Sequence, residues 1–385
     1  MKKVRDIFCV LLLLCTTMSC ENWLDVDPKT EIKSELMFQS VSGFKDALMG
    51  VYLTLRDPEL YGKEATWGFV DAIGQQTDIQ DQAAAYYNAS RYNYSQTSGV
   101  SDALWAKAFN AIVNLNNMLE NLDKQQNLFT PATYGVLKGE ALGLRAFLHF
   151  DLVRLFGWGN LAKKPENLEK LCMPYMTKYD KVLTKQLTVG EVLAHIEEDL
   201  LASIELLNNS DPYGLAPKQD DYDLPNEDKF FDNREKRFNY WAAVCTLTRV
   251  YMWMGRKGEA LTLAKSFIDK GGRTSWIDSY TIDAYYEKDR DLTFSREHVF
   301  ALDIAELFES VKHYIDPNAN KPNRNADLLY HSSERANKLF EAVNGVSTDY
   351  RYKRWYNKVN DFFDGWAFYK YWEVEEYSHG SVLPL

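Results

Sequence analysis

The stretch "YGVLKGEALGLRAFLHFDLVRLFG", from Tyr134 to Gly157, decides the architecture of this chain. It reads as one helix that carries apolar residues on nearly all of its faces and stops at a glycine. Such a helix exposes apolar surface to water unless other elements cover it on every side. We therefore expect it to lie in the middle of a stack of helices.

Three neighbouring stretches predict helices that could cover it. Residues 42–57 repeat apolar side chains at three- and four-residue spacing, which forms one face of a helix. Residues 101–123 do the same after a plausible N-cap at Ser101. Residues 188–207 are amphipathic, with acidic residues on the outer side. The chain is therefore predicted to be all-α.

Residues 240–269 predict two helices that are broken between Gly255 and Gly258. Small residues in this stretch approximate the tetratricopeptide pattern, in which they let paired helices approach. Residues 101–157 form a looser version of the same unit. Two pairs are too few for a free-standing solenoid, which needs about three. We expect a tetratricopeptide-like helical repeat scaffold whose open faces are covered by other elements.

Long irregular segments are expected between the helices, at residues 65–100, 208–237, 271–322 and 349–377. Irregular segments of this length in a compact protein are usually functional or disordered. Their many aromatic rings argue against disorder.

The N-terminus resembles a secretion signal. A basic start precedes an apolar run from Ile7 to Cys15, which is too short to cross a bilayer as a helix. Ser19 directly before Cys20 fits a bacterial lipoprotein cleavage site, so we expect residues 1–19 to be removed and Cys20 to be acylated. The alternative is an ordinary signal peptide that happens to contain Cys20.

The cysteines fit an exported protein that does not depend on disulfides. Removal of the signal and acylation of Cys20 leave only Cys172 and Cys245 of the five cysteines. One bridge between these two remains open, although Cys245 is most simply a small core residue.

Composition excludes some partners and leaves one question open. The 385 residues carry a net charge of −11, which argues against nucleic acid or anionic lipid as a partner. Hydrophobic residues make up 46%, enough for a large core, and aromatic residues make up 14%. The rings indicate either a large helical core or a ligand surface built from flat side chains.

No catalytic or metal-binding motif stands out. His-x-x-x-His, Gly-x-Ser-x-Gly, Gly-x-x-x-x-Gly-Lys and Cys-x-x-Cys patterns are all missing from the sequence. His149 falls in the apolar helix and is expected to be a hydrogen-bonded core residue. The acidic run at 219–228 could hold Ca²⁺, but a solvated charge run is favoured. We expect no cofactor.

Several pieces of the chain occur in an order typical of one family. Cys20 is followed by "NWLDVDP" at 22–28, and the "GEALGLRAFLHFDLVRLFG" segment at 139–157 is the most specific piece. "STDYRYKRWY" at 347–356 contributes an Asp-x-Arg segment. Over essentially its whole length the chain resembles the SusD/RagB-like outer-membrane lipoproteins of Bacteroidetes. It stops at "SVLPL", residues 381–385, where the family continues into further helices, so we expect a C-terminal truncation, either a fragment or a gene shortened by a stop or frameshift.

The resemblance implies a function. Members of the family are cell-surface, lipid-anchored binding proteins, not enzymes. They bind glycans or other nutrients such as peptides and sit over a SusC-like TonB-dependent transporter. By this resemblance the chain divides into a signal peptide at 1–19, an N-terminal region with the first helix pair at 20–230, and a truncated C-terminal region with the second pair at 231–385.

Rings in the irregular segments are the expected ligand contacts, because the apolar faces of sugars stack on Trp and Tyr. Trp105, Trp241 and Trp253 fall in helices and are expected in the core. For every loop ring, a place in the core or against the transporter is as plausible as ligand contact. The loop rings are Trp67, Tyr86, Tyr87, Tyr92, Trp276, Tyr280 and Trp366.

Two other functions remain open at this point. The first is a lipid-anchored scaffold that binds peptides or partner proteins without nutrient uptake. The second, ranked last, is an exported glycoside hydrolase, since a chain with 55 Asp and Glu residues always contains some carboxylate pair.

Overall fold

The computed structural model describes residues 36–79, 81–218, 220–271, 276–286, 290–305, 307–316, 327–360, 363–368, 370–371 and 381–384. Cys20 and the expected signal at 1–19 lie outside the described residues, so acylation of Cys20 stays a prediction.

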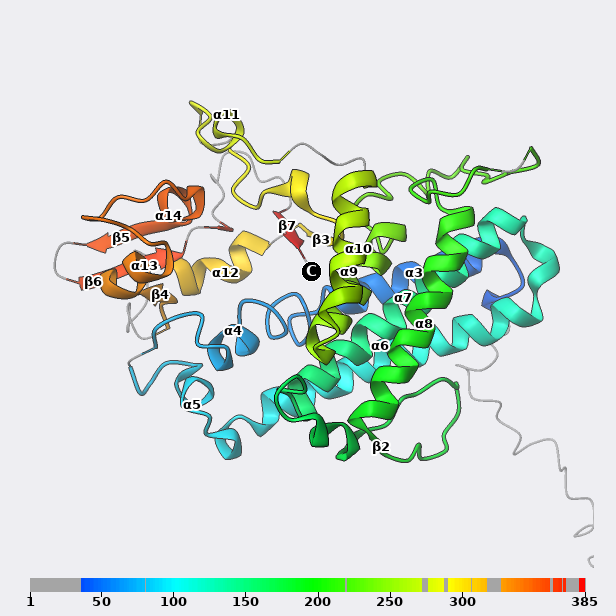
Figure 1. Ribbon diagram of the computed structural model, residues 1–385, viewed down its shortest axis with the longest axis horizontal. Helices are drawn as coiled ribbons and strands as arrows, with labels where there is room; N and C mark the ends of the chain where they lie inside the picture. Colours follow the sequence, from blue (N-terminus) through cyan, green and yellow to red (C-terminus); the bar gives the residue numbers. More distant parts are fainter. Residues whose placement is uncertain are drawn as a thin grey trace, which may run out of the picture.

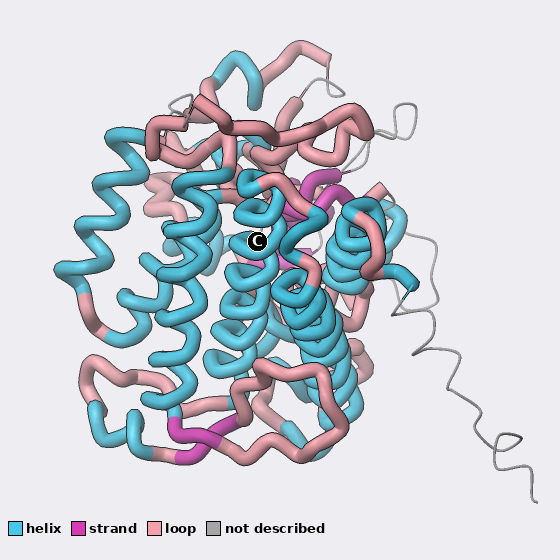
Figure 2. The backbone as a smooth tube through the Cα atoms, turned by 90° about the vertical axis from the view of Figure 1, so that its right-hand side faces the viewer, coloured by secondary structure: helices cyan, strands magenta, loops and turns pink. Residues whose placement is uncertain are grey.

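A stack of long helices forms the larger part of the molecule, which we call the helical body (Figure 1). Helix α7 lies between α6 and α8, α8 packs on α9, α9 packs on α10, and α3 packs on α6. Figure 2 shows these helices side by side. Their bounds are α3 (Val41–Leu55), α6 (Ser98–Lys124), α7 (Pro131–Phe156), α8 (Val189–Ser210), α9 (Tyr240–Met254) and α10 (Lys257–Lys270).

Helix α7 is the centre of the body, as the sequence predicts. Buried residues occur on all of its faces, and its neighbours form one continuous core with it. The helix begins after Thr130, whose side chain accepts a hydrogen bond from the Thr133 N–H, with Pro131 in the first turn. It ends at Phe156, one residue before the expected glycine.

The helices begin and end within three residues of the expected bounds; the largest differences are the starts of α6 and α7 and the end of α8. A capping box between Thr188 and Glu191 starts α8. Gly255, with φ of +80°, ends α9 in the left-handed region that glycine tolerates best. The expected cap at Ser101 is wrong, because α6 begins at Ser98 and the Ser101 hydroxyl donates to the Ser98 carbonyl inside the helix.

Two glycines let α7 approach its neighbours closely. A Cβ on Gly139 would lie 2.8 Å from Cγ of Leu207 in α8, and one on Gly143 would lie 2.1 Å from Cε1 of Phe238. The close approach also lets the Ser203 hydroxyl donate to the Gly139 carbonyl at 2.6 Å. Side chains at these positions would force the helices apart.

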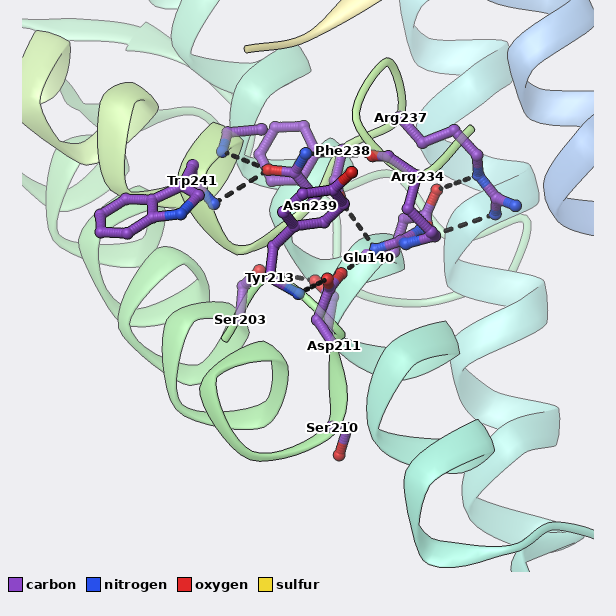
Figure 3. Close-up of polar contacts among 12 residues, drawn as sticks. Glu140, Ser203, Ser210, Asp211, Tyr213, Arg234, Arg237, Phe238, Asn239 and Trp241 are labelled. Atoms are coloured by element: carbon purple, nitrogen blue, oxygen red, sulfur yellow. Dashed lines mark hydrogen bonds and ion pairs between the residues drawn. The ribbon is translucent and has the colours of Figure 1, made fainter. Parts of the chain in front are cut away.

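A buried charge network around Glu140 ties the segment before α9 onto α7 (Figure 3). Arg234 contacts the carboxylates of both Glu140 and Asp211. Arg237 donates from Nε to Oε1 of Glu140 at 3.0 Å, and the Tyr52 hydroxyl donates to the same oxygen at 2.5 Å. Burial alone would raise the pKa of Glu140, but the charges of Arg234 and Arg237 outweigh it and hold the pKa below its usual value.

A second buried polar set lies one turn further along α7. Arg145 donates from Nε and Nη2 to the two carboxylate oxygens of Asp199, each at 2.7 Å, and from Nη1 to Asn116 Oδ1 at 3.0 Å. His149 pairs through Nδ1 with the Arg145 carbonyl at 2.8 Å and accepts at Nε2 from the Met176 N–H. Burial lowers the pKa of His149 to about 3. The expectation of a hydrogen-bonded core histidine is confirmed.

A smaller lobe lies at the side of the body (Figure 1). Its first part packs α4 (Phe69–Ile73) and α5 (Tyr87–Ser90) against α12 (Leu307–Ile315) around an apolar core of its own. Its second part is an antiparallel sheet in the order β4 (Tyr330–His331), β6 (Phe363–Phe368), β5 (Tyr356–Asn360), accompanied by α13 (Ser333–Leu339) and α14 (Tyr350–Arg354).

The register of the sheet joins the two parts of the lobe. Tyr330 lies opposite Ala367, and Tyr356 lies opposite Phe368. Asp78, from the segment after α4, bridges to Tyr330 through its N–H at 2.8 Å. Asp78 and Tyr330 are therefore neighbours in the lobe, although they lie about 250 residues apart in the sequence.

The remaining elements are short. Two-stranded pairs form between β1 and β2 and between β3 and β7. Their bounds are β1 (Leu171–Met173), β2 (Leu187–Thr188), β3 (Ala301–Ile304) and β7 (Ser381–Pro384). Helix α11 (Ser279–Ile282) and the 3₁₀ turns η2 (Tyr94–Gln96), η3 (Gln126–Leu128), η4 (Pro165–Glu169) and η6 (Ser295–Glu297) lie in connecting segments.

Cys172 and Cys245 are both free, so the bridge that the sequence left open does not form. Within the described ranges, none of the helices is both long and apolar enough to span a bilayer.

Candidate functional site

A cavity of about 280 Å³ opens in the lobe, between α4 on one side and the sheet with α13 and α14 on the other. The segment 67–77 forms one wall, and residues from 329 to 368 form the other. The lining residues are Trp67, Asp71, Gln76, Thr77, Leu329, His331, Leu339, Phe340, Arg351, Trp355, Tyr356 and Phe368.

Aromatic rings hold the sheet side of the cavity in place. The Tyr356 ring centroid lies 5.5 Å from that of Phe340 and 5.6 Å from that of Phe368. Trp355 is half-buried, and its indole N–H donates to the Leu292 carbonyl at 2.6 Å, which fixes the plane of the ring. Phe294 packs against this indole with a centroid distance of 5.0 Å, so a ligand can use only the part of the ring that stays exposed.

Two buried polar atoms in the wall lack a partner among the residues that the structure describes. Thr77 is 9% exposed and His331 is 3% exposed, yet neither Thr77 Oγ1 nor His331 Nδ1 makes a hydrogen bond within the described part of the chain. Burial, and then the charge of Arg335, lower the pKa of His331 to about 4, so its ring is neutral at pH 7. Buried groups without partners are uncommon in native structures and call for an explanation.

Asp71 adds a carboxylate without a hydrogen bond in the described ranges. It comes from α4 and is half-buried in the wall. Burial raises its pKa to about 6, although the nearby Lys370 ammonium acts in the opposite direction. Burial also lowers the pKa of Lys370 to about 8, and its Nζ lies 5.0 Å from the centroid of the Trp355 ring.

The other charges near the cavity are paired. The guanidinium of Arg351 donates to both carboxylate oxygens of Asp349, with Nη2 at 2.7 Å from Oδ2. Arg335 contacts Asp78 at 2.9 Å. The cavity therefore offers an aromatic wall, one carboxylate, the hydroxyls of Thr77 and Tyr356, and one neutral imidazole.

This set of groups suits a ligand that has both apolar faces and hydroxyls. Rings cover apolar C–H surface, and a few placed polar groups fix the orientation of the ligand. Within the described ranges, no cluster of His, Cys, Asp and Glu has the geometry to hold a metal ion, and this includes the described part of the acidic run at 219–228.

The rings at 67 and 86 lie in turns, as expected, but they are buried because the segment that carries them packs into the lobe. Trp67 lines the cavity but is only 2% exposed, and its indole donates to the Gly62 carbonyl. Tyr86 is buried, and its hydroxyl donates to Glu64. Both pack near the ring of Tyr314 in α12, so neither presents an open face.

The other predicted rings scatter over the surface of the molecule. Tyr87 is half-buried under Arg91, and Tyr92 is exposed beside another tyrosine. Trp276 and Tyr280 are 67% and 88% exposed on the segment around α11. Trp366 on β6 is half-buried and donates its indole N–H to Ser333 Oγ at 2.8 Å. Among the seven predicted rings, only Trp67 is a lining residue of the cavity.

Sequence reasoning missed the residues that give the cavity its chemistry. Asp71, Thr77 and His331 carry no local signal in the sequence. Trp355 and Tyr356 fall at the end of the "STDYRYKRWY" segment, which contributed to the family resemblance. That segment was the one available pointer to this wall.

The sequence matches described here are to SusD-like proteins. Residues 22–219 match the family SusD-like_3, described as "Starch-binding associating with outer membrane". SusD-like protein P25 of Formosa agariphila is 26% identical over 190 residues, which is 47% of this chain and 36% of that protein. SusD-like protein P38 of the same organism is 26% identical over 210 residues, 52% of this chain and 37% of that protein. The matched region thus spans little more than a third of either relative.

Solved structures share the fold. A SusD superfamily protein from Bacteroides fragilis superposes with a TM-score of 0.63 at 16% identity, covering 90% of this chain and 72% of that one. A putative sugar binding protein from Bacteroides vulgatus superposes with a TM-score of 0.62 at 22% identity, covering 87% and 68%. At these identities the likeness concerns the fold, and it confirms the expected helical scaffold.

Proposed function

The chain belongs to the SusD-like family, and on that premise we propose that it binds oligosaccharides at the bacterial outer membrane through the cavity beside α4. The observation that carries this proposal is the cavity wall, where an oriented Trp355 ring faces the same space as three polar groups that lack hydrogen-bond partners in the described chain. A sugar unit supplies an apolar face for the ring and hydroxyls for the polar groups.

Delivery and anchoring complete the proposal. The protein would pass its ligand to a SusC-like TonB-dependent transporter, and acylated Cys20 would hold it on the outer face of the membrane. The description of the family supports the membrane association and the class of ligand.

The exposed rings of the α11 segment extend the proposal. Asp283, next to α11, pairs with Arg354 of α14 at 2.5 Å, so this segment lies against the helix that also brings Arg351 to the cavity. Trp276 and Tyr280 would provide a second contact, either for a longer glycan or for the transporter.

Binding by variants with one ring removed tests the proposal. A glycan array with the purified protein selects the best ligand, and titration calorimetry gives its affinity for the wild type and for Trp355→Ala. Loss of a stacking ring at a binding site typically costs about 2 kcal/mol, so the affinity should fall roughly thirtyfold.

Trp158→Ala is the matched control, because Trp158 is exposed on the helical body with Lys170 Nζ 4.0 Å from its ring centroid. It should bind like the wild type. If Trp355→Ala is folded and binds normally, or if the wild type binds nothing on the array, the proposed function is wrong. Trp276→Ala, measured in parallel, reports on the α11 segment separately.

A further inference from the structure

We infer that the cavity takes a single uncharged sugar unit, the end of an oligosaccharide, and that Asp71 sets this preference by accepting hydrogen bonds from the sugar hydroxyls. This inference rests on the proposed function and adds the class of sugar and the residue that selects it. Three features of the cavity carry it: its size, its charge balance and its free polar atoms.

The size favours the end of a chain. Ligand pockets usually enclose roughly 300–1,000 Å³. A cavity of about 280 Å³ lies below that range and has room for about one sugar ring, not for a run of several. The rest of a longer ligand would lie outside the cavity.

The charge balance favours a neutral unit. Arg351 is neutralised by Asp349, and Asp71 faces the Lys370 ammonium. An anionic sugar would bring its carboxylate or sulfate toward Asp71, and like charges in a partly buried site repel strongly. A cationic sugar would compete with Lys370, whose ammonium already lies over the Trp355 ring. A neutral unit leaves both pairs undisturbed.

The free polar atoms match hydroxyls. An ionised carboxylate only accepts hydrogen bonds, whereas a sugar hydroxyl both donates and accepts. Asp71 lacks a donor in the described chain, and Thr77 Oγ1 and His331 Nδ1 lack partners as well. A ligand that donates to Asp71 and exchanges hydrogen bonds with the other two satisfies all three groups.

The same contact makes binding depend on pH. Hydroxyl donors favour the ionised form of Asp71, whose pKa is about 6 in the free protein. Affinity should therefore rise between pH 5 and pH 7, and binding near pH 6 should release protons. The groups that face Asp71 are the ammonium of Lys370 and the hydroxyls of Tyr356 and Tyr371, with neutral His331 and paired Arg351 also in the wall.

Titration calorimetry with defined hexasaccharides tests the preference. The neutral probes are the malto-, cello-, manno-, xylo- and galacto-hexaoses, the anionic probe is hexagalacturonate, and the cationic probe is fully deacetylated chitohexaose. We expect the best neutral probe to bind at least tenfold more tightly than either charged probe at pH 7. Tighter binding of a charged probe would overturn the inference but leave the proposed function standing, whereas no binding of any oligosaccharide would overturn both.

Asp71→Asn tests the role of the residue. It should weaken binding of the best neutral probe about tenfold or more, because hydrogen bonds to a charged acceptor are the strong ones. It should also abolish the rise in affinity between pH 5 and pH 7, which a merely structural role would not produce. Asp102→Asn, which changes an exposed carboxylate on α6, is the matched control. If Asp71→Asn keeps both the affinity and the pH dependence of the wild type, Asp71 does not select the ligand.

Discussion

The helical body and the lobe both place carboxylates away from water, but they treat them in opposite ways. In the body, Glu140 is fully buried and meets Arg234, Arg237 and the Tyr52 hydroxyl. In the lobe, Asp71 faces a cavity without a hydrogen bond in the described ranges. Burial would raise the pKa of both groups, yet the pKa of Glu140 is lowered and that of Asp71 is raised to about 6. The presence of a cationic partner, and not the degree of burial, therefore decides whether a carboxylate serves the stability of the fold or remains available to a ligand.

The largest effect should come from breaking the pairing in the body. Arg234→Met leaves the buried carboxylate of Asp211 without its cation, and removing one partner of a buried ion pair costs about 3–5 kcal/mol. Urea unfolding should show a loss of stability of that size. Arg256→Met is the control, because its pairs with Glu197 and Glu259 are partly exposed and contribute about 1 kcal/mol or less. Equal losses in the two variants would contradict the comparison.

Acidification should weaken the body through His149. Its folded pKa of about 3 lies below the usual value of 6.5, so the unfolded chain binds the proton first as the pH falls. The stabilisation is complete above pH 6.5 and is lost toward pH 3. At pH 5 the loss is about 2 kcal/mol, since one pKa unit corresponds to about 1.4 kcal/mol.

Urea unfolding at pH 7 and pH 5 checks this sign. The difference between the two pH values should shrink by about that amount in His149→Gln and stay unchanged in His195→Gln, whose ring is exposed. Asp71 acts with the opposite sign, because its raised pKa makes protonation favour the folded state. An unchanged pH dependence in His149→Gln would show that the ring does not stay neutral when buried.

The smallest effect should come from the wall of the cavity. Thr77→Val removes a buried hydroxyl that has no partner in the described chain, so stability should stay the same or rise by up to about 1 kcal/mol. Ser203→Ala removes another buried hydroxyl, one that donates to the Gly139 carbonyl, and it should cost about 1 kcal/mol. A clear loss of stability in Thr77→Val would mean that its hydroxyl serves the fold and not a ligand.

The body was predictable because its signals are local. The apolar faces of α7, the Thr188 cap of α8 and the break at Gly255 each occur within a few residues of sequence. The start of α6 was misplaced at Ser101 because Ser98, three residues earlier, offers a similar residue and local sequence does not rank the two.

The lobe was not predictable in the same way, because its burial is set by contacts between distant segments. Trp67 reads as a loop ring beside Gly68, yet α12 closes over it from more than 230 residues further along the chain. Trp355 also falls in a stretch expected to be irregular, yet its side chain stays only half-buried. Nothing in the neighbouring sequence separates these two tryptophans, since the difference lies in what packs against each of them.

The bridge between Asp78 and Tyr330 also has a consequence for the order of folding. The segment that carries Trp67, Asp71 and Thr77 can complete its packing only when α12, β4 and α14, far along the chain, reach it. Closing a loop of this length is slow compared with forming helices from neighbouring residues. The body can therefore fold from segments that are close in sequence, and the cavity can form only after residues 329–368 have joined the segment 67–77.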